Sequence, residues 1–185
     1  MLSRDEALAL LGDVPREENQ MFHALESEAV LRKLAERLGE DPELWGLTGL
    51  LHDLDFPETR EEPTRHGLVG AEMLEGKLPE VALNAIRAHN GELNGTTPAT
   101  SLDWALRCGE SVTGLVSANA LIRPTGMQGM KPKSLKKKMK NKAFAAAVSR
   151  EIINECSHLG LELGEFFQLS IDAITPLAGQ VGLSK

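Results

Sequence analysis

Two ionisable residues, His52 and Asp53, close the apolar run LWGLTGLLHDLD. The leucines of this run, Leu47, Leu50, Leu51 and Leu54, fall at i, i+3, i+4 and i+7, the spacing of one helical face. Burying an imidazole and a carboxylate at the end of such a face is costly unless something binds them. Because imidazole and carboxylate together suit several divalent ions, the pair is a candidate metal site.

Three further histidines occupy positions where a ligand could be presented. His23 lies on the inward face of one predicted helix, His66 follows Thr64 in the first turn of another, and His89 ends the buried face of a third. A single buried histidine is more often a core or capping residue than a ligand. Together, however, three imidazoles at helix termini and one on a buried face are what a metal cluster assembled from several helices requires. We expect the fifth, His158, to be structural or exposed, since it lies beside a predicted helix break.

Helical patterns run through almost the whole chain, and no strand alternation persists. We expect helices over about residues 3–11, 17–38, 42–54, 65–76, 79–89 and 101–122, helices again from 134 with a break at 158–160, and a last one over 164–178. Ser3 and Glu6 form a capping box for the first helix, and Gly39 ends the second. The sequence therefore predicts an all-α fold, a helical bundle in one domain over residues 1–185.

The order of the histidines resembles a known pattern. His23, then His52-Asp53, then His66 and His89 resemble the series H…HD…H…H…D of HD-domain metal-dependent phosphohydrolases, in the form with two metal sites. The stretches AIRAHNGE, ALRCGESVTGLVSANALIRP and SLKKKMKNKAFAAAVSRE are similar to the HDIG-type subgroup. This resemblance covers residues 20–155 and implies an HD-type helical bundle, on which the helices of residues 160–185 would pack.

The closing aspartate of the family pattern is replaced in this chain. The stretch before Thr113-Gly114-Leu115 reads CGES, so the position that matches the aspartate is Glu110, and the nearest aspartate is Asp103. Seven residues of helix separate the two by about 10 Å, so both cannot serve one metal. Asp103 also suits a first helical turn after Thr100, where a carboxylate accepts from free amides. We predict Glu110 as the last ligand and keep Asp103 as the alternative.

The resemblance implies a two-ion site. The first ion would be held by His23, His52, Asp53 and Glu110, and Asp53 would bridge to a second ion held by His66 and His89. Two such ions acidify a water and bind the attacking and leaving oxygens of a phosphoryl group, which implies phosphate-ester hydrolysis without a serine or cysteine nucleophile. The ligand types suit one or two ions of Mn, Fe, Co, Ni or Zn and do not select among them.

Other polar residues are candidates for supporting roles. Asp55, which follows the His-Asp pair where the subgroup has glycine, would either orient a ligand histidine or take a proton from the water. Arg123, Lys136, Lys137 and Lys138 would meet the substrate phosphate or else be solvated surface charges. The lysines belong to residues 131–142, which hold seven lysines and no acid, while the rest of the chain sums to −14. Nucleic acid is a weaker candidate partner, because no aromatic residue interleaves with these lysines.

Composition bounds the class of protein. A hydrophobic content of 42% and a charged content of 25% are those of an ordinary globular domain. No apolar stretch approaches the roughly 18 residues of a membrane span, the charged start MLSRDEALALLGD is unlike a signal peptide, and Cys108 and Cys156 form no CxxC pattern. We therefore expect a cytoplasmic protein with reduced thiols and no membrane partner.

Three functions are compatible with these features. The first is a metal-dependent phosphohydrolase or phosphodiesterase that acts on a small phosphorylated substrate, for example a nucleotide. The second is an oxygenase with two irons, since some HD-type proteins have that activity. The third is a non-catalytic binding module whose metal site is weakened by the change to Glu110. The sequence sets neither the substrate nor the oligomeric state.

Overall fold

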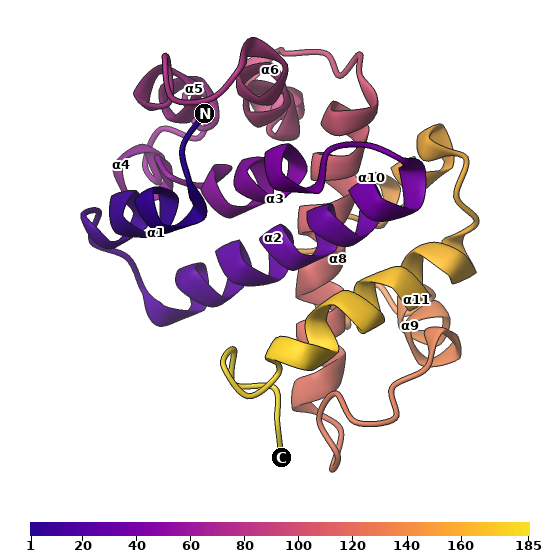
Figure 1. Ribbon diagram of the computed structural model, residues 1–185. Coiled ribbons are helices and arrows are strands. Elements are labelled where there is room, and N and C mark those ends of the chain that lie inside the picture. Colours follow the sequence, from indigo (N-terminus) through magenta and orange to yellow (C-terminus); the bar gives the residue numbers. More distant parts are fainter.

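A computed structural model describes all residues, 1–185, and every regular element in it is a helix. The predicted all-α fold is confirmed. Four helices form its centre: α2 (Glu18–Leu38), α3 (Pro42–Leu51), α6 (Glu80–His89) and α8 (Ser101–Leu121). Figure 1 shows α2 crossing α8, with α5 and α6 towards one end of α8 and α9 and α11 towards the other.

The remaining helices are shorter and cover this centre. They are α1 (Arg4–Gly12), α4 (Phe56–Thr59), α5 (Leu68–Met73), α7 (Gly91–Asn94), α9 (Pro132–Met139), α10 (Arg150–Asn154) and α11 (Leu163–Ile174), with 3-10 turns η1 (Glu155–Leu159) and η2 (Thr175–Leu177). One continuous cluster of buried apolar side chains joins them, from Leu11 in α1 to Phe166 and Phe167 in α11. No helix has both the length and the apolar character that crossing a bilayer demands.

Most helix ends lie where local capping signals predict them. Ser3 and Glu6 form the expected capping box at α1, and Gly39 ends α2 in the left-handed region at φ 75°. Asp41 accepts from the amide of Glu43 at the start of α3. The ends of α2 and α3 matter for the site, because these helices carry His23 and His52.

The helix predicted over residues 65–76 is wrong in its start and its length. It begins only at Leu68, after Gly67 at φ 82°, and Thr64 does not cap it. The carboxylate of Asp55 accepts from the amides of Gly67 and Gly70, at 2.8 and 2.9 Å, and so performs the capping from a distant part of the chain. His66 therefore lies in the turn before the helix.

The C-terminal third is more interrupted than its sequence pattern predicts. α9 begins at Pro132, and residues 140–149 then leave the helix before α10 starts at Arg150. The Arg150 guanidinium donates to four backbone carbonyls in this segment, including those of Ala145 and Val148, and so stabilises its irregular path. Arg150 forms no ion pair with a carboxylate, so its role is to bind these carbonyls. Beyond it, α11 packs on α2, α8 and α9.

Close contact between α2 and α3 depends on a glycine. A Cβ atom at Gly49 of α3 would lie 2.8 Å from the carbonyl oxygen of Ser27 in α2, closer than real Cβ atoms approach. The obstacle is backbone, so the helices would have to separate. The contact is therefore part of what positions the end of α3, where His52 and Asp53 lie.

We predict that Gly49→Ala lowers the free energy of unfolding by about 1–3 kcal/mol through overpacking. The matched control is Gly12→Ala in α1, where an added Cβ meets nothing within 4 Å and φ is not positive. That change should raise stability by up to about 1 kcal/mol through helix propensity. Urea unfolding followed by circular dichroism measures both, and equal effects would contradict the packing argument.

Candidate metal centre

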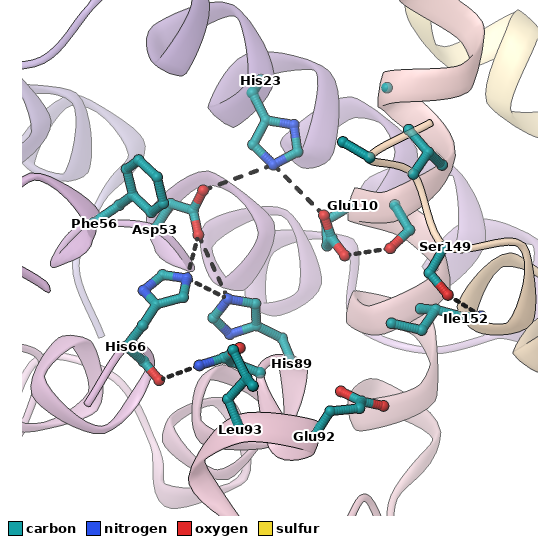
Figure 2. Close-up of a pocket in the computed structure, with 15 residues that line it drawn as sticks. His23, Asp53, Phe56, His66, His89, Glu92, Leu93, Glu110, Ser149 and Ile152 are labelled. Atoms are coloured by element: carbon teal, nitrogen blue, oxygen red, sulfur yellow. Dashed lines mark hydrogen bonds and ion pairs between the residues drawn. The ribbon is translucent and has the colours of Figure 1, made fainter. Parts of the chain in front are cut away.

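The side chain of Asp53 lies at the meeting point of four imidazoles. Its Oδ1 is 3.1 Å from Nε2 of His66, 3.3 Å from Nε2 of His52 and 3.5 Å from Nε2 of His89. Its Oδ2 is 3.8 Å from Nε2 of His23. Figure 2 shows His23, His66 and His89 pointing at this carboxylate. Residues spread over 67 positions of sequence thus converge, and they come from α2, α6, the end of α3 and the turn before α5.

These five residues divide into two sets that share Asp53. His23, His52 and Asp53 form one, and Asp53, His66 and His89 form the other, with the potential ligand atoms of each set within 4.8 Å of one another. The Asp53 carboxylate lies near both sets, with Oδ1 close to His52, His66 and His89 and Oδ2 closer to His23. The bridging role that the sequence resemblance implies for Asp53 stays a prediction, with which this position is compatible.

Two of the imidazoles are oriented by carbonyls at the ends of their own helices. Nδ1 of His52 donates to the carbonyl of Gly49 at 2.8 Å, and Nδ1 of His89 donates to the carbonyl of Ile86 at 2.5 Å. A carbonyl can only accept, so both protons are on Nδ1 and both Nε2 atoms present a lone pair. This is the tautomer that binds a metal through Nε2.

The other two imidazoles are oriented by side chains. Nδ1 of His66 donates to Oδ1 of Asp55 at 2.9 Å. Nδ1 of His23 is 2.9 Å from Oγ1 of Thr113, whose hydroxyl donates to the carbonyl of Glu110 and is therefore left to accept. All four Nε2 atoms consequently face inward with their Nδ1 protons already bound elsewhere.

This arrangement requires a cation among the imidazoles. The Nε2 atoms of His23 and His52 are 3.2 Å apart, and those of His66 and His89 are 3.0 Å apart. Two lone pairs at such distances repel unless a proton or a metal lies between them. The donor set, imidazole with a shared carboxylate, fits divalent transition metals.

In the metal-free site, the closeness of these ionisable groups shifts their pKa values. Burial opposes ionisation of Asp53, but His52 and the other imidazoles outweigh it and bring the pKa of this carboxyl well below its usual range. Burial lowers the pKa of His52 to about 3. For His66 burial is outweighed by Asp53 and Asp55, which raise its pKa to about 10. In the absence of metal, a proton on His66 therefore supplies the positive charge.

Glu110 reaches the cluster and Asp103 does not. Oε2 of Glu110 is 3.7 Å from Nε2 of His23, and its Oε1 accepts from Ser111 at 2.5 Å. Burial raises the pKa of Glu110. Asp103 is buried one turn into α8, where its carboxylate accepts from Thr100, Ala99 and Asn84. Each residue thus lies where the sequence analysis preferred it, Glu110 beside the first histidine and Asp103 in a cap.

Asp55 contacts the cluster through His66 and does not contact the space where a substrate would bind. It is buried, does not line the cavity, and accepts from His66, Gly67 and Gly70. Of the two roles considered from the sequence, orientation of a histidine agrees with these contacts. The other, removal of a proton from water, stays a prediction that these contacts do not support, because the carboxylate is 1% exposed and does not line the cavity.

A cavity of about 640 Å³ opens beside the cluster (Figure 2). Its walls combine His23, Asp53, His66, His89, Glu110, Asn90, Glu92, Ser111 and Ser149 with the less polar Phe56, Leu93, Gly114, Ala147, Val148 and Ile152. No lysine or arginine lines it. The four cations considered from the sequence lie elsewhere: Arg123 donates to carbonyls of Gly126 and Gln128, Lys138 lies over the ring of Phe144, and Lys136 and Lys137 are exposed on α9.

The role of one buried arginine near the cavity could not be predicted from the sequence. Arg107 of α8 forms ion pairs with Glu92 and Glu155 and donates to the carbonyl of Ala88, at the end of α6. Its partners lie 15 and 48 residues away, so local patterns could not identify it. It ties the end of α6, and hence His89, to α8.

We predict that Asp55→Asn weakens metal binding at the set that contains His66 by about 10–100-fold, as loss of a ligand's supporting partner generally does. An asparagine can still accept from His66, but its amide nitrogen cannot accept from Gly67 and Gly70. Calorimetric titration with Mn²⁺ measures the effect, and the exposed Asp172→Asn is the control. Unchanged binding in Asp55→Asn would contradict the orienting role.

We also predict that metal binding releases protons at neutral pH. His66, with a pKa of about 10, is protonated below that pH and must lose its Nε2 proton to a metal, whereas His52, with a pKa of about 3, has none to lose. Filling the His66 set at pH 7 should release about one proton per ion. Apparent affinity should rise with pH up to about 10. Titrations in buffers of different ionisation enthalpy count the protons, and a buffer-independent heat would contradict the assignment.

Comparison with known proteins agrees with this geometry. The HD domain family profile matches residues 21–145. The chain is similar to ribonuclease Y of Clostridium novyi (strain NT), with 37% identity over 78 residues, which are 41% of this chain and 15% of that one. It is also similar to ribonuclease Y of Thermobifida fusca (strain YX), with 33% identity over 106 residues, 54% of this chain and 21% of that one.

The matched segment therefore spans no more than about a fifth of these relatives. No solved structure matches the chain. Since the profile covers more than half of the residues and includes all of His23, His52, Asp53, His66 and His89, the chain belongs to the HD domain family, a superfamily of metal-dependent phosphohydrolases.

Proposed function

We propose that this protein is a metal-dependent phosphoric ester hydrolase that acts on a small phosphorylated substrate through a metal-activated water. The observation that supports this most is the sharing of Asp53 between two histidine sets at the wall of a cavity of about 640 Å³. When two divalent ions are bound there, they supply an acidified water and positive charge for the phosphoryl oxygens.

In this proposal the protein residues fix geometry more than they transfer protons. His23, His52, His66 and His89 hold the ions through Nε2, and Asp53 lies between the two sets. Glu110 completes the set of His23, with an approach of 3.7 Å that leaves room for a cation between them. Asp55 and Thr113 act as positioning residues for His66 and His23.

The cavity suits an ester with a compact organic group. Phe56, Leu93, Val148 and Ile152 give it apolar surface, and Asp53, Glu92 and Glu110 place carboxylates in its walls. Without metal, the protonated imidazole of His66 is the one positive group that a phosphate would meet there, against three carboxylates. This favours substrates that are bound through the ions at the phosphate and through apolar contact at the organic group.

A phosphodiester of RNA is a second candidate, because the similar proteins are ribonucleases Y. The absence of basic residues from the cavity argues for short substrates, since an RNA chain needs cations along its backbone. The two candidates differ in whether activity falls or rises with the length of the nucleotide chain.

We predict that the Mn²⁺-loaded protein hydrolyses phosphate esters and that Asp53→Asn abolishes this activity. A panel would contain an aryl phosphate, a bis-aryl phosphodiester, nucleoside monophosphates and a short RNA oligonucleotide. Highest kcat/KM for one of the small esters supports the proposal, and highest kcat/KM for the oligonucleotide favours the RNA candidate. Full activity in Asp53→Asn would contradict both the small-ester and the RNA candidates.

We further predict opposite behaviour for the two acidic residues of α8. Glu110→Gln should lower metal affinity and kcat/KM by roughly 10–100-fold while leaving the fold intact. Asp103→Asn, the matched change in the cap, should lower the free energy of unfolding by about 1–2 kcal/mol and leave kcat/KM of the folded enzyme unchanged. The reverse pattern would make Asp103 the ligand.

A further inference from the structure

The metal centre borders a second opening besides the main cavity. A cavity of about 340 Å³ is lined by Glu17, Asn19, Gln20, His23, Asp53, Phe56 and Arg60. Three of these residues, His23, Asp53 and Phe56, also line the main cavity. The first metal-ligand set therefore stands between two spaces of different character.

The two spaces differ in charge and polarity. The main cavity is lined by three carboxylates, no lysine or arginine, and several apolar residues. The second has a single apolar residue, Phe56, and its two carboxylates, Glu17 and Asp53, are accompanied by two amides, the imidazole of His23 and the guanidinium of Arg60. An anion that approaches the metal centre would meet a fixed positive side chain only in the second space.

Arg60 forms a single exposed ion pair, so its guanidinium is available to another anion. Its partner is Glu17, at 3.4 Å, and both side chains are more than half exposed. Ion pairs of this kind contribute at most about 1 kcal/mol. A phosphate oxygen, which accepts stronger hydrogen bonds from a guanidinium, can therefore replace the carboxylate.

A second arginine, Arg16, directly precedes Glu17 in the chain but does not itself line this opening. Its Nε donates to the carbonyl of Leu11 at 3.1 Å. Its Nη2 is buried and has no hydrogen-bond partner. Burial lowers the pKa of Arg16, and the charge of Asp53 opposes this shift. Because the unpaired Nη2 is not open to the cavity, Arg16 contributes positive charge to this region and no direct contact.

The helix that borders this opening adds to the same preference. Glu17, Asn19 and Gln20 belong to the first turn of α2, a helix of 21 residues. The amide end of such a helix carries partial positive charge. Its contribution adds to that of the two arginines and cannot replace them.

We propose that the second cavity is the phosphate side of the metal centre, and that Arg60 binds a phosphate oxygen of the substrate that the metal ions leave free, while Arg16 contributes positive charge. This rests on the proposed hydrolase function and specifies its substrate orientation. The phosphate points towards α4 and the start of α2, and the organic group lies in the main cavity against Leu93, Val148 and Ile152. The ester class that fits is a terminal phosphate, since a bulky second ester group would occupy the smaller space.

Binding of inorganic phosphate to the Mn²⁺-loaded protein tests the proposal without requiring turnover. Arg60→Gln should weaken phosphate binding about tenfold, as loss of one charged hydrogen bond does, and should leave Mn²⁺ affinity unchanged. Arg16→Gln, which removes charge but no direct contact, should weaken phosphate binding by less. Arg37→Gln is the matched control, since Arg37 is also an exposed arginine of one surface ion pair, with Glu165, and lines neither cavity.

Arg16 also contacts the end of α1, so its removal can affect folding. Arg16→Lys keeps the charge and should retain part of the phosphate affinity, and thermal unfolding of each variant separates stability from binding. Val148→Ala, on the opposite side, should leave phosphate affinity unchanged and raise KM for an aryl phosphate. Arg60→Gln is exposed and decides the matter even where Arg16→Gln does not fold.

Two results would overturn the proposal: no phosphate binding to the metal-loaded protein, or equal binding by wild type, Arg60→Gln and the folded Arg16 variants. These are separable from failure of the hydrolase function. A protein that binds phosphate through these arginines but hydrolyses no ester keeps the assignment of the cavity and loses the function. A protein that hydrolyses esters but binds phosphate equally well without these arginines would support the hydrolase function and contradict the assignment of the second cavity.

Discussion

The hydrogen bond on the outer nitrogen of each histidine is the constraint on which the metal centre depends. An imidazole presents a lone pair inward only when its other nitrogen keeps the proton. His52 and His89 achieve this with carbonyls three residues earlier, at the last turns of α3 and α6. Carbonyls at a helix end have no partner within the helix. The end of each helix therefore provides both the place and the tautomer of its ligand.

Helix packing extends this constraint to the remaining ligands. Gly49, whose carbonyl accepts from His52, is also where α3 approaches the backbone of α2. On α8, a Cβ at Gly109 would lie 2.7 Å from the Leu31 side chain in α2. Close approach at Gly109 places the next residue, Glu110, opposite His23. The helix contacts that pack the core thus also set the positions of the ligands, so a change that separates the helices also separates the ligands.

The sequence was informative where the relevant signal is local. Helix ends at Ser3, Gly39 and Thr100 depend on side chains within three residues, and the all-α fold follows from apolar spacing. The start of α5 could not be predicted in this way, because its amides are bound by Asp55 from a distant turn. From the sequence, Asp55 could be either a base or a residue that orients a histidine, and only its burial in the structure distinguishes these two roles.

Charged residues show the same limit. The lysines of α9 stand out by number, yet none of them lines either cavity at the metal centre. Arg16 and Arg60 have no pattern around them, and their relation to Asp53 depends on how the start of α2 and the turn of α4 meet. The histidine order could be matched to a family because one residue type recurs in series. Isolated arginines give no such series.

The two functions of the site, chemistry and substrate choice, have different structural origins. The ligands come from α2, α3, α6 and α8, whose positions are fixed by the buried core. Part of the organic wall comes from residues 147–149, an irregular segment stabilised by Arg150 and by contact of Val148 with α8, where a Cβ at Gly114 would be 2.9 Å away. Segments of this kind tolerate sequence change more readily than a packed helix does. Under the proposed function, changes in this segment would therefore alter which ester is bound, while the imidazoles and Asp53 stay as they are.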